Sequence, residues 1–192
     1  MSTDQAVFID RDGTLNEEVG YLNHPQRLCL IPGSAEAVRK LNASGLRAVV
    51  ATNQSGVAKG YLSESLLQDL HEELIRQLKA EGAFIDGIYV CTHHPTEGGP
   101  PFRRECDCRK PKPGLLLRAA ADLHLDLSRS FVVGDKISDV EVAHRVGARG
   151  VLVLTGYGLG ERDFRRRLWP ATPDHIAENL LDAVGWILEQ CR

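Results

Sequence analysis

Two aspartates separated by one residue, Asp10 and Asp12, stand in the sequence FIDRDGTL after the first apolar run. A carboxylate at a strand end can attack phosphorus and form an aspartyl phosphate. A second carboxylate two residues later can protonate the leaving oxygen and then deprotonate a water molecule. Gly13 allows the tight turn that brings the two together. The same residues also suit a solvated turn, but their position directly after a strand favours the chemical interpretation.

Three further polar segments could serve the same chemistry. The sequence ATNQSG places Thr52 after an apolar run, where a hydroxyl and backbone N–H groups can hold phosphate oxygens. The run RKPKP contains Lys110, and the sequence GDKISD contains Asp135 and Asp139. Taken alone, these segments also fit a polar turn, an exposed basic run and a carboxylate at a helix N-terminus.

A pair of cysteine-containing segments indicates a metal site. Cys91 and His93 are followed by Cys106 and Cys108, which makes a Cys₃His set. Residues i and i+2 of an extended chain face the same side, so we expect His93 rather than His94 to be the ligand. The alternative is three unrelated thiols in a polar loop. Four protein ligands leave no open position, so the sequence predicts a structural Zn²⁺.

The rest of the chain alternates short apolar runs with helical periodicity, which predicts an α/β fold with a mostly parallel sheet and helices on both faces. Ligands bind at the carboxyl ends of such strands, where the residues singled out above fall. Residues 92–112 interrupt the alternation with an irregular segment. The expected strands are 6–9, 46–51, 84–91, 131–134 and 151–154, and the expected helices are 33–44, one capped by Ser63, one from Pro113 to about 125, 139–146 and 177–189.

Length and composition favour one domain over residues 1–192, with 43% hydrophobic and 26% charged residues. A net charge of −3 argues against a general nucleic-acid or membrane-surface binder. No signal peptide and no bilayer-spanning apolar run is evident, so we expect a cytoplasmic protein. The odd number of cysteines, 5, argues against a disulfide framework. No exposed apolar stripe stands out, and we expect a monomer.

The order of the four polar segments resembles the haloacid dehalogenase (HAD) superfamily over about residues 6–160, and Asp12 marks its phosphatase branch. The resemblance implies a Rossmann-like HAD fold with Asp10 as nucleophile and Asp12 as acid and base. The short connections leave no room for a large cap domain, and the zinc-binding loop covers about 91–110. The residues implied to hold Mg²⁺ are Asp10, the backbone carbonyl of Asp12 and Asp135, with Asp139 outside the coordination shell, and those on the phosphate are Thr52 and Lys110.

The segments CTHHP, CDCRKPKPG and VLVLTGYG resemble a narrower branch, the heptose bisphosphate phosphatases. This implies a phosphorylated sugar substrate, with Asn53, Arg109 and Lys136 in contact with it. The nearest alternative is the histidinol-phosphate phosphatases, whose loop between the metal-ligand pairs is typically shorter than the 12 residues from 94 to 105 here. A non-catalytic phosphate-binding module is disfavoured, because the catalytic carboxylates and the lysine are all present.

Overall fold

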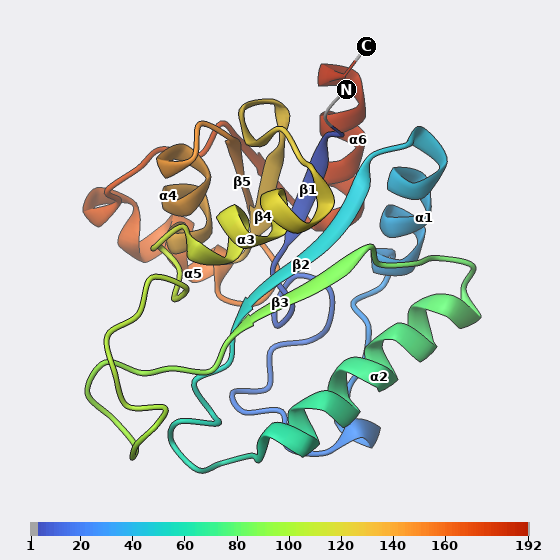
Figure 1. Cartoon of the computed structure of the whole chain (residues 1–192). Coiled ribbons are helices and arrows are strands. Elements are labelled where there is room, and N and C mark those ends of the chain that lie inside the picture. Colours follow the sequence, from blue (N-terminus) through green and yellow to red (C-terminus); the bar gives the residue numbers. More distant parts are fainter. Residues whose placement is uncertain (1–3, 192) are drawn as a thin grey trace.

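A computed structural model describes residues 4–191 and is built around a 6-stranded sheet in the order β3-β2-β1-β4-β5-β6 (Figure 1). All neighbouring strands run parallel. The strands are β1 (Ala6–Ile9), β2 (Arg47–Asn53), β3 (Gly87–Cys91), β4 (Phe131–Gly134), β5 (Arg149–Val153) and β6 (His175–Ala177). The helices are α1 (Ser34–Ser44), α2 (Glu64–Ala80), α3 (Gly114–Leu123), α4 (Ile137–Arg145), α5 (Gly158–Gly160) and α6 (Leu180–Gln190), with short 3-10 or π turns η1 (Pro25–Arg27), η2 (Leu127–Arg129), η3 (Glu161–Arg165) and η4 (Arg166–Leu168).

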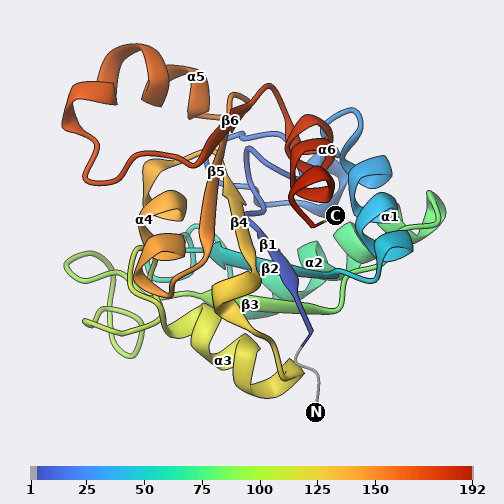
Figure 2. The ribbon, with the colours of Figure 1, turned by 90° about the horizontal axis from the view of Figure 1, so that it is seen from above.

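Successive side chains of β1 belong to two separate layers of the core. Val7 and Ile9 pack with the apolar faces of α1, α2 and α6, whereas Ala6 and Phe8 pack with α3 and α4. Successive side chains of a strand point to opposite faces, so a buried strand must be apolar throughout. Figure 2 shows α1 and α6 on one face of the sheet and α3 and α4 on the other. The expected parallel sheet with helices on both faces is confirmed.

The bounds of β2 and β3 differ from the sequence expectations. β2 extends two residues further than expected, because Thr52 and Asn53 continue the ladder opposite β3. β3 begins at Gly87 rather than Phe84. The backbone N–H of Phe84 instead donates to the side chain of Asn42, and the Asp86 carboxylate accepts from the backbone N–H of Ala48.

The expected helix over 177–189 was wrong at its start. Ala177 belongs to β6, which is three residues long and therefore too short to show a period in the sequence. The helix α6 begins after Asn179, whose side chain accepts from the backbone N–H of Asp182. Similarly, α4 begins at Ile137 rather than at Asp139.

The connections at the carboxyl edge of the sheet are loops. Residues 92–113 form an irregular loop after β3 (Figure 1), as expected. Within residues 4–191, no separate cap domain is inserted after β1 or after β3. None of the helices in this described part is long and apolar enough to cross a membrane.

Candidate active site and metal centre

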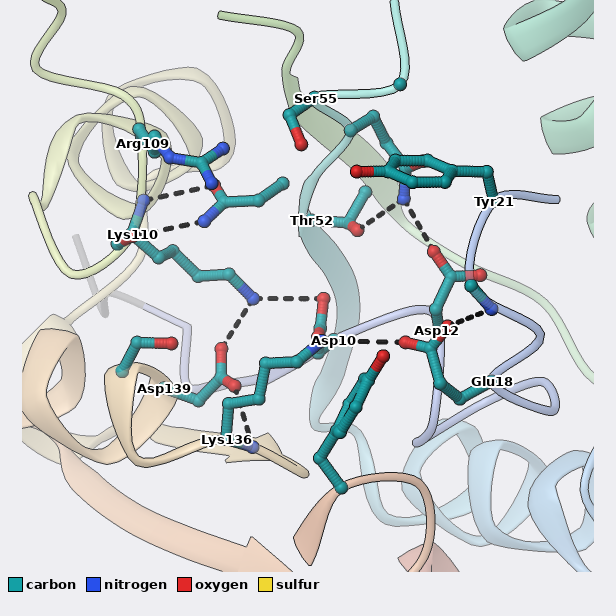
Figure 3. Close-up of a pocket in the computed structure, with 16 residues that line it drawn as sticks. Asp10, Asp12, Glu18, Tyr21, Thr52, Ser55, Arg109, Lys110, Lys136 and Asp139 are labelled. Atoms are coloured by element: carbon teal, nitrogen blue, oxygen red, sulfur yellow. Dashed lines mark hydrogen bonds and ion pairs between the residues drawn. The ribbon is translucent and has the colours of Figure 1, made fainter. Parts of the chain in front are cut away.

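Side chains from several strand ends surround a cavity of about 340 Å³ at the carboxyl edge of the sheet (Figure 3). Parallel strands place their carboxyl ends at one edge, so residues distant in sequence meet there. Asp135 has no exposed surface and is not among the residues that line the cavity. The other predicted residues of the phosphatase site line the cavity: Asp10, Asp12, Thr52, Asn53, Arg109, Lys110, Lys136 and Asp139.

Lys110 forms ion pairs with two carboxylates that also line this cavity, Asp10 and Asp139 (Figure 3). Its ammonium lies 3.0 Å from an oxygen of Asp10, 2.5 Å from an oxygen of Asp139 and 2.7 Å from the carbonyl oxygen of Ala51. Burial alone would lower the pKa of Lys110, but attraction by Asp10 and Asp139 outweighs it and raises that pKa. The lysine is therefore a fixed positive charge beside Asp10.

Three buried carboxylates fit a divalent cation. One oxygen from each of Asp10, Asp135 and Asp139 lies within 4.8 Å of the others. The Oδ1 atom of Asp135 is buried without a hydrogen-bond partner, while Oδ2 accepts from the backbone N–H of Tyr157. Burial and the negative charge of Asp10 raise the pKa of Asp135 to about 8. A cation would relieve this repulsion, and a small set of oxygen ligands suits Mg²⁺.

The Asp12 carboxylate is held by a buried network. Arg11 has no exposed surface, and its guanidinium donates to both Asp12 oxygens at 2.7 to 3.1 Å. The side-chain amides of Asn16 and Gln54 donate to the same carboxylate at 2.9 and 2.8 Å. Burial opposes ionisation of Asp12, but attraction and hydrogen bonds from Arg11, with those of Asn16 and Gln54, lower its pKa. Asp12 is therefore a carboxylate in this arrangement.

His71, on α2, completes this network. Its Nε2 atom lies 3.4 Å from a guanidinium nitrogen of Arg11. A guanidinium has only donors, so Nε2 must be an unprotonated acceptor. Burial, with repulsion from Arg11, lowers the pKa of His71 to about 4. The histidine is thus neutral at pH 7.

We predict that His71 makes the protein sensitive to acid. Above pH 6.5 the histidine is neutral in both states, whereas between pH 6.5 and about 4 only the unfolded state binds the proton. Stability therefore falls as the pH falls, by about 2 kcal/mol between pH 7 and 5. Denaturant unfolding at pH 7 and pH 5 measures this loss of unfolding free energy. The loss should be smaller in His71→Gln than in the wild type, whereas the exposed control His24→Gln should lose as much as the wild type. Equal losses in all three proteins would contradict the prediction.

Four other predicted ligands meet in a second cluster. One side-chain atom from each of Cys91, His93, Cys106 and Cys108 lies within 4.8 Å of the others. The sulfurs of Cys91 and Cys106 are 3.7 Å apart, and the Nδ1 atom of His93 is 3.3 Å from the Cys108 sulfur. A disulfide needs about 2.05 Å, whereas tetrahedral Zn–S bonds of about 2.3 Å place sulfurs about 3.8 Å apart. The geometry fits zinc.

Two of the predicted substrate contacts, Arg109 and Lys136, add cationic side chains to the cavity lining. Arg109 lines it and also donates to the carbonyl oxygen of His93 in the cysteine loop, at 3.3 Å. The Lys136 ammonium lies 3.5 Å from Glu18 and 4.5 Å from the ring centre of Tyr157. A phosphorylated ligand in the cavity would therefore meet both cations.

Several residues of the site were not predicted from the sequence. Gln54 bridges Asp12 and Thr52, donating to both at 2.8 and 2.9 Å. Glu18, Tyr21 and Tyr157 also line the cavity. Gln54 follows Thr52 in the same strand-end segment, a signal that could have identified it.

The fold and the site define a hydrolase of the HAD class. A family model described as HAD-hydrolase-like matches residues 107–183. The crystal structure of D,D-heptose 1,7-bisphosphate phosphatase from B. bronchiseptica, complexed with magnesium and phosphate, has a TM-score of 0.84 to this chain at 30% sequence identity. The match covers 97% of this chain and 99% of that one.

Sequence relatives narrow the class further. A D-glycero-D-manno-heptose-1,7-bisphosphate 7-phosphatase from Thermosynechococcus vestitus is 46% identical over 95% of this chain and 94% of that protein. A D-glycero-beta-D-manno-heptose-1,7-bisphosphate 7-phosphatase from Escherichia coli K12 is 42% identical, covering 95% and 87% respectively. The chain therefore belongs to the heptose-1,7-bisphosphate 7-phosphatase family of HAD hydrolases and is a phosphoric monoester hydrolase. The resemblance in the sequence is confirmed.

Proposed function

We propose that this enzyme removes the C7 phosphate of D-glycero-D-manno-heptose 1,7-bisphosphate through an aspartyl phosphate on Asp10. The observation that carries the proposal is the contact of Asp10 with the buried cation Lys110 in an open cavity. The names of the relatives support the heptose substrate, and the bound ligands of the B. bronchiseptica enzyme support magnesium.

In the first half-reaction, an Asp10 oxygen attacks phosphorus and the bond to the sugar oxygen breaks. The electron pair goes to that oxygen, which takes a proton from Asp12. Lys110 balances the negative charge of nucleophile and phosphate, and Thr52 holds a phosphate oxygen. Water then attacks the phosphorus of the aspartyl phosphate, and Asp12 accepts its proton. Magnesium, held by Asp10, the Asp12 carbonyl and Asp135, with Asp139 outside its shell, would neutralise charge on the phosphate oxygens.

The network around Asp12 suits its second role directly. Both of its oxygens accept hydrogen bonds, from Arg11, Asn16 and Gln54, which keep Asp12 ionised, the form that can accept a proton from water. Donation of a proton to the sugar oxygen requires the neutral acid. One donor must then turn away from Asp12 to leave room for its proton, because a protonated oxygen presents a donor of its own.

We further propose that the Cys₃His cluster binds a structural Zn²⁺. The separations of its sulfur and nitrogen atoms support this assignment. Zinc would order the loop that ends at Arg109 and Lys110, because Cys108 directly precedes them. The single domain, the monomeric state and the cytoplasmic location stay predictions.

The substrate assignment is tested by phosphate release with magnesium. Both anomers of the heptose bisphosphate should be compared with histidinol phosphate. We expect a heptose bisphosphate to give the highest kcat/KM, and the β anomer in particular, since the Escherichia coli relative is named for it. Preference for histidinol phosphate would overturn the substrate assignment while leaving the Asp10 chemistry intact.

A further inference from the structure

We propose that Asn53 is a positioning residue for Lys110. The side-chain amide of Asn53 both donates a hydrogen bond to the backbone of Lys110 and accepts one from it. The Nδ2 atom donates to the Lys110 carbonyl oxygen at 3.0 Å, and the Lys110 backbone N–H donates to Oδ1 at 3.0 Å. The partners fix the amide orientation, since a carbonyl can only accept and an N–H can only donate.

Asn53 stands on a rigid part of the fold. It is the last residue of β2 and pairs with Cys91 of β3. The backbone N–H of the next residue, Gln54, donates to the Cys91 carbonyl oxygen at 2.7 Å, which continues this attachment. Lys110, in contrast, lies in a turn at the end of an irregular loop. The amide therefore ties a loop residue to the edge of the sheet.

The position of the Lys110 backbone matters because its side chain has no freedom to compensate. The ammonium donates to the carbonyl oxygen of Ala51 and forms ion pairs with Asp10 and Asp139. The side chain is only 3% exposed, so a displaced backbone would draw the ammonium away from at least one carboxylate. Asn53 thereby fixes the charge that faces the nucleophile.

This role differs from the substrate contact expected from sequence resemblance. Asn53 lines the cavity, but the amide edge that supplies both a donor and an acceptor is turned to the Lys110 backbone. Asparagine is suited to this task, since an aspartate of the same size can accept from the backbone N–H but cannot donate to the carbonyl. The inference rests on the proposed function, in which Lys110 balances charge at the phosphate.

The chain offers a matched control in α1. Asn42, in α1, makes the same reciprocal pair of hydrogen bonds with the backbone of Phe84, both at 3.0 Å. Both asparagines are half-buried, but Asn42 is absent from the cavity lining. Loss of either amide should lower the melting temperature, whereas only Asn53 should affect turnover.

The test compares Asn53→Ala with Asn42→Ala, using heptose 1,7-bisphosphate and magnesium. We expect Asn53→Ala to lower kcat about 10- to 100-fold, as expected when a catalytic group moves by about 1 Å, with KM changed less than about threefold. Asn42→Ala should keep the wild-type kcat. Equal kcat values for the two variants would overturn the inference, as would a defect confined to KM.

A double-mutant cycle tests the route through Lys110. In a Lys110→Met background, single-turnover phosphate release should fall less than about twofold on adding Asn53→Ala. A full further loss would show that Asn53 acts independently of Lys110 and would overturn the inference. If Asn53→Ala does not fold, Asn53→Asp replaces it, with Asn42→Asp as its control. Wild-type activity in Lys110→Met alone would instead contradict the proposed function.

Discussion

Replacing the nucleophile by its neutral amide, Asp10→Asn, should abolish turnover while leaving the fold intact. The amide nitrogen and oxygen cannot form the aspartyl phosphate, and removal of the nucleophile in another covalent enzyme costs on the order of 10⁶ in kcat. We expect a loss of at least about 10⁴ here. The structure should tolerate the change, because the variant removes one of three crowded carboxylates. The remaining amide oxygen can still accept from Lys110.

The measurement is phosphate release with magnesium, together with a thermal melt of each protein. The control is Asp69→Asn, which makes the same chemical change at an exposed position of α2. The control should match the wild type in both measurements. Substantial residual turnover in Asp10→Asn, above the level set by deamidation back to aspartate, would contradict the nucleophile assignment.

The second large effect is expected from loss of zinc. Cys106→Ser removes one of four ligands, so the purified variant should lack stoichiometric zinc. Zinc binding contributes directly to the stability of the loop it orders. Because Cys108 is two residues from Lys110, we expect the lysine to shift and kcat to fall about 10- to 100-fold. Zinc content by atomic emission and kcat on the same sample test both effects.

The exposed thiol Cys29 supplies the matched control, since it lies outside the metal cluster. Cys29→Ser should keep both its zinc and its activity. A zinc-free Cys106→Ser protein that stays folded and fully active would show that the loop does not position Lys110. The metal assignment itself would fail if the wild type held no zinc.

Short motifs at strand ends made much of the site predictable. Asp10 and Asp135 each follow an apolar strand directly, so the parallel sheet brings them together once the strands are in place. The cysteine loop was predictable for a similar reason. Its ligands occur in pairs with one residue between them, and the structure brings His93, not His94, to the three sulfurs.

Tertiary partners could not be predicted in this way. Arg11 stands between two aspartates and suggests a solvated turn, yet it is fully buried. Its guanidinium contacts His71 of α2, which lies 60 residues away in the sequence. The role we infer for Asn53 likewise depends on a partner 57 residues away. No local sequence pattern indicates such contacts, because the two partners lie far apart in the sequence.

During turnover the phosphoryl group is expected to pass through Asp10. A single turnover is quenched on the millisecond scale, and the quenched protein is treated with borohydride. Mass spectrometry of the peptide that contains Asp10 then reports the residue. We expect borohydride to convert Asp10 to homoserine in samples quenched during turnover, when the aspartyl phosphate is present, and we expect the Asp69→Asn control to give the same product. Complete phosphate release with no modified Asp10 at any time, or with the modification on another residue, would contradict it.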